Sequence, residues 1–227
     1  MEADTTLCLE AAISCYDNFL LKKHLHFLSE MDSAFDFHTH HLSTPPGRGI
    51  VNLPKDILPR PHTFCPEEGA LYSAGIHPWW TTGDVKTLLE GLKELLPHPQ
   101  IVALGECGLD RLQGAPMVVQ EEVFVAQATL AEQYGLPMTI HCVRAFDRLL
   151  ALHKLLRPTH RWTLHGFRGK PRLACQLLEA GFDLSFGLHF HPDSLRLVPA
   201  ERRHTETDDA PCTIAEVRRE QERALML

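Results

Sequence analysis

Several histidines and carboxylates of this sequence stand where they could bind metal ions, beginning with His38 and His40. Alternate residues of a β-strand share one face, so two imidazoles at this spacing can bind one cation. Asp36 lies on the same face by the same rule and could orient them, because a ligating histidine usually donates from its second ring nitrogen. A chance grouping in a chain with 15 histidines would explain these three residues equally well.

Glu106 is the next candidate ligand. It ends an apolar run and has Gly105 before it and Gly108 shortly after it. A buried carboxylate is costly unless it is paired or binds a metal ion. The alternative is a loop glutamate paired with Arg111, which explains this motif slightly better when it is taken alone.

His141, His165 and Asp208 also end apolar runs. A single histidine in such a place is more often a core residue, but two of them, 24 residues apart at matching strand ends, indicate a shared site. Strand alternation places Glu206 on the same face as Asp208. A solvated acidic turn is the alternative for these last two residues.

The elements that must position these residues are short apolar strands alternating with longer amphipathic helices. The predicted strands are 34–38, 49–53, 71–77, 101–106, 138–142, 162–167, 183–187 and 204–208. The predicted helices are 84–96, 116–134, 145–156, 170–180 and 213–225. This α/β order predicts a (β/α)8 barrel of the TIM type, eroded in its first two strand–helix units by prolines and short at the C-terminus.

The six candidate ligands then fall on the first, fourth, fifth, sixth and eighth strands. All of them lie at the carboxyl ends, where TIM barrels hold their chemistry. The set suits two divalent metal ions that share Glu106 as a bridge. Imidazole and carboxylate donors suit zinc, manganese, iron or, less well, magnesium, so the metal's identity stays unknown.

Composition limits the other interpretations. Residues 1–33 are predicted to be a helical extension before a barrel domain over 34–227. A formal net charge of −7 argues against a broad phosphate-binding surface. No apolar run reaches the about 18 residues of a membrane span, and the acidic N-terminal region lacks the pattern of a secretory signal, so we expect a cytoplasmic protein. Seven irregularly spaced cysteines predict reduced thiols, and no stable protein partner is inferred.

Taken together, these motifs resemble the TatD family of metal-dependent hydrolases over about residues 34–211. The motifs that carry the resemblance are Asp36–His40, Gly75–Pro78, Gly105–Asp110, Ile140–Cys142, His165–Gly169 and Glu206–Asp208. Three features depart from the family pattern: a short gap between Asp36 and Gly75, the N-terminal extension, and few residues after Pro211.

The resemblance implies an amidohydrolase-type TIM barrel with two metal ions. Residues that match His38, His40, Glu106 and Asp208 would hold one ion, and those that match Glu106, His141 and His165 would hold the other. Asp208 would also accept the proton of the attacking water. Because family members are described as deoxyribonucleases, DNA is the implied substrate and phosphodiester hydrolysis the implied activity.

The substrate side of the site is open to more than one interpretation. By motif, His77 would lie near the substrate, and Arg144 and Arg168 are available for phosphate oxygens, although surface salt bridges explain the two arginines equally well. Trp79 and Trp80 could stack a base or simply cover the barrel mouth. Two alternatives to a nuclease remain: a hydrolase of a small phosphoester, carboxylic ester or amide, and a non-catalytic metal-binding descendant.

Overall fold

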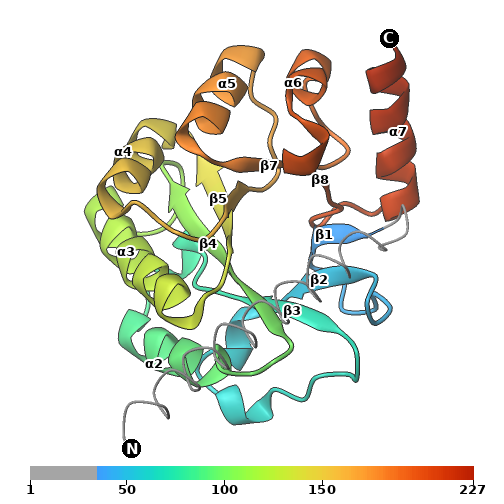
Figure 1. Ribbon diagram of the computed structural model, residues 1–227. Helices are drawn as coiled ribbons and strands as arrows, with labels where there is room; N and C mark the ends of the chain where they lie inside the picture. Colours follow the sequence, from blue (N-terminus) through green and yellow to red (C-terminus); the bar gives the residue numbers. More distant parts are fainter. Residues whose placement is uncertain (1–34) are drawn as a thin grey trace, which may run out of the picture. The chain divides into compact units, whose positions relative to one another are not determined.

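The computed structural model describes residues 35–227; the extension predicted over residues 1–33 lies outside the described residues. Eight parallel strands pair in chain order and form a barrel, with helices around it (Figure 1). The strands are β1 Asp36–Thr39, β2 Gly49–Asn52, β3 Leu71–Ala74, β4 Ile101–Asp110, β5 Met138–Val143, β6 Trp162–Leu164, β7 Asp183–Phe186 and β8 Arg203–Thr205. The α-helices are α2 Val85–Leu95, α3 Met117–Tyr134, α4 Phe146–Leu156, α5 Pro171–Ala180, α6 Pro192–Leu197 and α7 Ile214–Met226.

The barrel closes where the eighth strand meets the first. Beyond the end of β8, Asp208 forms a parallel bridge with Thr39. The amide of Asp208 donates to the carbonyl of His38 at 3.0 Å, and the amide of His40 donates to the carbonyl of Asp208 at 2.9 Å. Three candidate ligands therefore lie on the backbone segments that close the barrel.

The first two strand–helix units are eroded, as the prolines predict. The connections from β1 to β2 and from β2 to β3 contain no α-helix, and the second holds only the short 3-10 helices η1 (Lys55–Ile57) and η2 (Pro61–Thr63). Leu58 is buried beside them and fills part of the space where a helix would otherwise cover the barrel. Its carbonyl packs directly on α2 at Gly91, where a Cβ atom would lie 1.6 Å from that oxygen.

Within residues 35–227 every predicted strand and helix is present, but several strands differ in extent: β3 ends at Ala74, β6 at Leu164 and β8 at Thr205, short of the predicted 77, 167 and 208. β4 continues past Glu106 to Asp110, because the stretch after Glu106 pairs with β5 along its whole length. The short helix α6, η3 (Pro78–Trp80) and η4 (Ala200–Arg202) were not predicted. Each is a turn or two long and follows or begins at a proline, so it lacks the apolar periodicity that marks longer helices.

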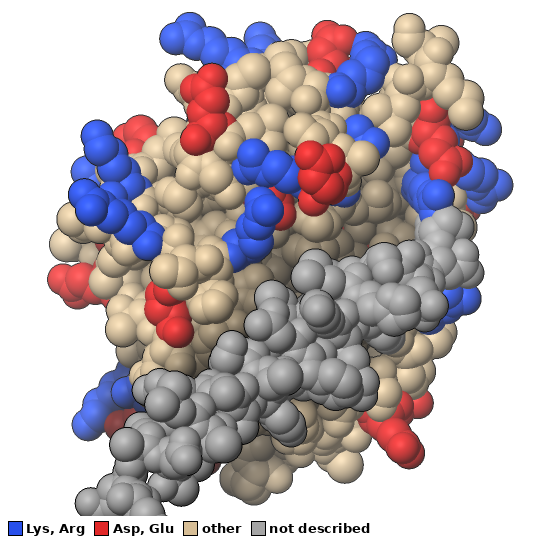
Figure 2. Space-filling model, viewed as in Figure 1, with Lys and Arg blue, Asp and Glu red and all other residues tan. Residues whose placement is uncertain are grey.

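The surface of the barrel carries both signs of charge. On the visible part of the face in Figure 2, lysine and arginine are interspersed with aspartate and glutamate. Within residues 35–227, no helix combines the length and the apolar character that a membrane crossing requires.

Asp183 opens β7 at the end of the barrel away from the candidate ligands, and it joins three basic residues. Its Oδ1 accepts from Arg161 Nη1 at 2.9 Å and Arg202 Nε at 3.0 Å, and His204 Nε2 lies 3.4 Å from Oδ2. Burial alone would raise the pKa of Asp183, but the hydrogen bonds of His204 and Arg202 hold it below its ordinary value.

We expect Asp183→Asn to lower the free energy of unfolding by about 2 kcal/mol, the scale of a hydrogen bond to a charged group. A depressed pKa stabilises the fold above the unfolded-state pKa of about 4, and this contribution disappears as the pH falls through the lower folded-state value. The gap between variant and wild type, measured by urea unfolding of metal-free protein, should therefore shrink below pH of about 4.

The matched control is Asp193→Asn in α6. That carboxylate is exposed and pairs with Arg196 three residues along the helix, so its loss should cost no more than about 0.5 kcal/mol. Equal effects of the two variants would show that the cluster around Asp183 does not stabilise the barrel.

Candidate metal centre

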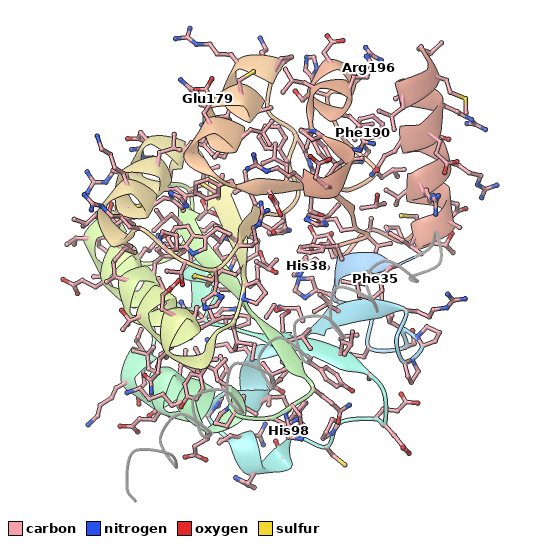
Figure 3. The ribbon with its side chains drawn as sticks, viewed as in Figure 1. Phe35, His38, His98, Glu179, Phe190 and Arg196 are labelled. Atoms are coloured by element: carbon pink, nitrogen blue, oxygen red, sulfur yellow. The ribbon has the colours of Figure 1, made fainter. Side chains whose placement is uncertain are left out.

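The six predicted ligands lie together inside the mouth of the barrel. His38 belongs to β1, Glu106 to β4 and His141 to β5, while His40 follows β1, His165 follows β6 and Asp208 follows β8. Figure 3 shows the labelled His38 pointing into the space that the strands enclose. The carboxyl ends of parallel strands meet at one end of the barrel, so residues far apart in sequence converge there.

Glu106 stands at the middle of the cluster and faces a different group with each oxygen. Oε1 lies 2.8 Å from His165 Nε2 and 2.9 Å from His141 Nδ1. Oε2 lies 3.2 Å from His40 Nε2 and 3.5 Å from His38 Nε2. One carboxylate thus divides the four histidines into two pairs.

Asp208 completes the pair formed by His38 and His40. Its Oδ1 lies 3.8 Å from His38 Nε2 and 3.5 Å from His40 Nε2. The backbone of Asp208 is left-handed, with φ of 56°, a conformation that aspartate and asparagine adopt more readily than most residues. This turn directs the side chain into the barrel mouth just after the strand ends.

Asp36 does not have the role that strand alternation predicts for it. Its carboxylate accepts from the Thr207 amide at 3.0 Å and from Thr207 Oγ1 at 2.6 Å, whereas neither ring nitrogen of His38 makes a hydrogen bond. Burial raises the pKa of Asp36 to about 6, against the lowering effect of the Thr207 hydrogen bonds. Asp36 therefore ties β1 to the segment that carries Asp208.

Irregular strand pairing aims two of the candidate ligands. The four residues of β4 from Leu104 to Cys107 lie opposite only three of β5, and the four residues of β1 from Asp36 to Thr39 lie opposite only three of β2. Such bulges redirect side chains and leave a backbone group unpaired. In β4 the amide of Glu106 is instead satisfied by the buried Asn52 Oδ1, at 2.7 Å.

Two further carboxylates contact the ring nitrogens of His141 and His165 that face away from Glu106. Asp110 Oδ2 lies 3.3 Å from His141 Nε2, which turns Nδ1 toward Glu106. Glu206 Oε1 lies 3.4 Å from His165 Nδ1 and accepts from the Gly166 amide at 2.6 Å. Carboxylates in this place fix the ring orientation and raise the basicity of a ligating histidine.

His77 also reaches the centre. Its Nδ1 accepts from the Trp79 amide at 3.2 Å, so in the neutral ring the proton is on Nε2, which lies 3.1 Å from Glu106 Oε1. Burial lowers the pKa of His77 and favours this neutral form. The ring can donate from Nε2 to an oxygen placed in the mouth.

The electrostatics of the cluster favour positive charge beside Glu106. Burial alone would raise the pKa of Glu106, but the neighbouring His165 and His141 hold it well below its ordinary value. The pKa of Asp208, by contrast, is raised, chiefly by burial. The centre thus contains a carboxylate that stays ionised and is surrounded by imidazole nitrogens.

A divalent metal ion fits this arrangement. His38 is completely buried, yet neither of its ring nitrogens makes a hydrogen bond, a costly state for a polar group without a ligand. Donor atoms of His38, His40 and Asp208 lie within 4.8 Å of one another, and so do those of His77, Glu106 and His141. Imidazole and carboxylate are the donor types that such ions bind in hydrolases.

The two arginines predicted for substrate binding lie outside this cluster. Arg144 is exposed, and its carbonyl accepts from Arg111 Nη1 at 2.8 Å. Arg111 also pairs with Asp147, so the pairing of Arg111 with Glu106 that the sequence left open is wrong. Arg168 lines an open groove of about 850 Å³ together with His189, Phe190 and other residues of the β7–α6 loop and α7.

The cysteines beside the candidate ligands face elsewhere. Cys107 is buried and donates to the Thr139 carbonyl, and burial raises the pKa of its thiol. Burial also raises the pKa of Cys142 to about 12. Neither thiol belongs to a cluster of candidate donor atoms within residues 35–227.

Eight parallel strands with histidines and carboxylates gathered at their carboxyl ends define a TIM barrel of the metal-dependent hydrolase type. Residues 62–224 match the family described as TatD related DNase. The chain belongs to this family.

Sequence relatives agree with this assignment. The chain is 35% identical over 152 residues to "3'-5' ssDNA/RNA exonuclease TatD" of Klebsiella pneumoniae (strain 342). The matched region covers 62% of this chain and 57% of the relative. It is 30% identical to "Uncharacterized metal-dependent hydrolase YabD" of Bacillus subtilis (strain 168), over 61% of this chain and 55% of the relative. It therefore spans little more than half the length of these relatives.

The fold has solved counterparts. The crystal structure of YjjV, a TatD homolog from Escherichia coli K12, superimposes with a TM-score of 0.66 at 20% identity, covering 85% of this chain and 94% of that one. A TatD family hydrolase from Entamoeba histolytica gives a TM-score of 0.55 at 23% identity, covering 70% of this chain and 59% of that one.

Proposed function

We propose that this protein is a metal-dependent nuclease that hydrolyses phosphodiester bonds of DNA or RNA with two divalent ions. The observation that carries the proposal is Glu106, whose two oxygens face two separate groups of histidines. Two ions that share one carboxylate suit the hydrolysis of phosphate esters. When bound, divalent ions would supply an activated water and neutralise charge on the phosphoryl oxygens.

Within this site, Asp208 is the residue best suited to accept a proton. Its side chain is 28% exposed, whereas that of Glu106 is 5% exposed and surrounded by imidazoles. Asp208 can therefore face both water and substrate. His77, with its proton on Nε2, would donate a hydrogen bond to a phosphoryl oxygen, and Arg168, outside the cluster, would hold a phosphate farther along the nucleic-acid chain.

The names of the relatives support a nucleic-acid substrate, because the Klebsiella pneumoniae protein is described as an exonuclease of single-stranded DNA and RNA. The surface charge supports a second candidate, a hydrolase of small phosphoesters. A net charge of −7, with basic and acidic groups interspersed on the face shown in Figure 2, gives little attraction for long polyanions.

We expect the protein, stripped with a chelator and reloaded with zinc, manganese or magnesium, to hydrolyse single-stranded oligonucleotides and to lose this activity when the chelator is added again. Metal content measured by elemental analysis should approach two ions per chain. Oligodeoxynucleotides, oligoribonucleotides and small phosphomonoesters would be assayed side by side. Hydrolysis confined to monoesters would favour the second candidate, and metal binding without any hydrolysis would contradict both.

A further inference from the structure

Trp79 lies at the rim of the candidate metal centre with a large exposed surface. Trp79 is 47% exposed, whereas its neighbour Trp80 is packed against the core. The Trp79 ring centroid is 4.7 Å from that of His77 and 5.9 Å from that of His141. An exposed indole thus stands directly beside two rings that face Glu106.

One buried carboxylate holds this indole in place. Trp79 Nε1 donates to Asp110 Oδ2 at 2.6 Å, the same oxygen that lies 3.3 Å from His141 Nε2. Asp110 Oδ1 accepts from the amide of Leu112 at 2.7 Å, and Leu112 is 59% exposed. Asp110 is itself fixed, since its amide donates to the buried Gln120 at 2.7 Å.

These contacts leave the indole rigid but open. Its only polar atom is satisfied on the protein side, so the exposed part of the ring offers an apolar aromatic surface. A ring that served only to pack would be buried like Trp162. An ordinary exposed apolar residue would not be hydrogen-bonded to Asp110, the carboxylate that also contacts the candidate ligand His141. A preformed, rigid aromatic surface is what stacking on a planar ligand requires.

We propose that Trp79 is a base-stacking residue, which holds the unpaired nucleobase next to the phosphate that lies at the metal centre. The proposal rests on the proposed function and deepens it. Stacking is tolerant of base identity because every base has a π-face. It also requires the base to be free of its partner strand, which agrees with the single-stranded substrates in the name of the Klebsiella pneumoniae relative.

The test compares substrates that differ only in the base. Wild type, Trp79→Ala and Trp79→Phe would be assayed on a short single-stranded oligothymidylate, on the same oligomer with abasic residues at both ends, and on an oligomer made entirely of abasic residues, a diester without a base or any other aromatic ring. Metal content would be measured for each variant. Trp79→Phe keeps a smaller aromatic face and loses the bond to Asp110.

We expect Trp79→Ala to lower kcat/KM on the oligothymidylate roughly 10- to 100-fold, the range that loss of base stacking produces. On the abasic oligomer and the base-free diester, the same variant should stay within about twofold of wild type. Trp79→Phe should keep most of the activity on oligothymidylate.

Equal losses on all three substrates would overturn the proposal, since Trp79 would then act only through Asp110 and His141. Wild-type protein that cleaves the abasic oligomer as well as the normal one would overturn it too. In both cases hydrolysis of the base-free diester would leave the proposed function standing. No hydrolysis of any diester by metal-loaded protein would overturn the proposed function and this inference together.

Discussion

Glu106→Gln is expected to remove both metal ions and reduce hydrolysis below detection. The amide keeps the shape of the carboxylate but loses the charge that five imidazoles face, and an amide cannot bridge two cations as a carboxylate does. The loss of metal affinity and activity should exceed the about 10- to 100-fold that follows removal of a residue hydrogen-bonded to a metal ligand. Elemental analysis and single-turnover assays at saturating metal would measure it.

Glu206→Gln is the matched control, because Glu206 is also a fully buried glutamate of the same centre. It touches one candidate ligand, His165, from behind, and its Oε1 can still accept from the Gly166 amide after the change. We expect about 10- to 100-fold weaker metal binding, with activity restored at high metal concentration. Full metal occupancy in Glu106→Gln would contradict the bridging role.

Asp208→Asn is expected to lower kcat by roughly 10²–10⁴-fold, the usual contribution of a general base. Asparagine tolerates the left-handed backbone at this position, so the barrel closure through Thr39 should persist. One of the two ions should bind more weakly, since its site loses a negative donor. Thermal unfolding, metal content and kcat at saturating metal would be measured for the same preparation.

Asp209→Asn is the control for Asp208→Asn. Asp209 is exposed and next in sequence, and none of the donor clusters within residues 35–227 includes it. Its replacement should leave kcat within about twofold of wild type, as surface substitutions usually do. An inactive Asp209→Asn beside a nearly normal Asp208→Asn would show that the proton acceptor has been assigned one residue away from its true position.

The sequence by itself determined the fold and the identity of the clustered residues. Apolar runs of strand length alternating with amphipathic stretches predicted all eight strands, because burial on both faces of a parallel sheet leaves that pattern. Residues at strand ends such as His141 and His165 could be assigned to one site without coordinates, since a barrel brings all carboxyl ends to one mouth.

Only the tertiary structure decided how those side chains are aimed and supported. Strand alternation assumes regular pairing, and the bulges in β1 and β4 break it where His38 and Glu106 lie. For this reason Asp36 contacts Thr207, 171 residues away, and not the histidines. The bonds that join Asp110 to Trp79 and His141 likewise cross 31 residues of sequence. Such long-range contacts depend on loop positions and strand register, which leave no periodic signal in a single sequence.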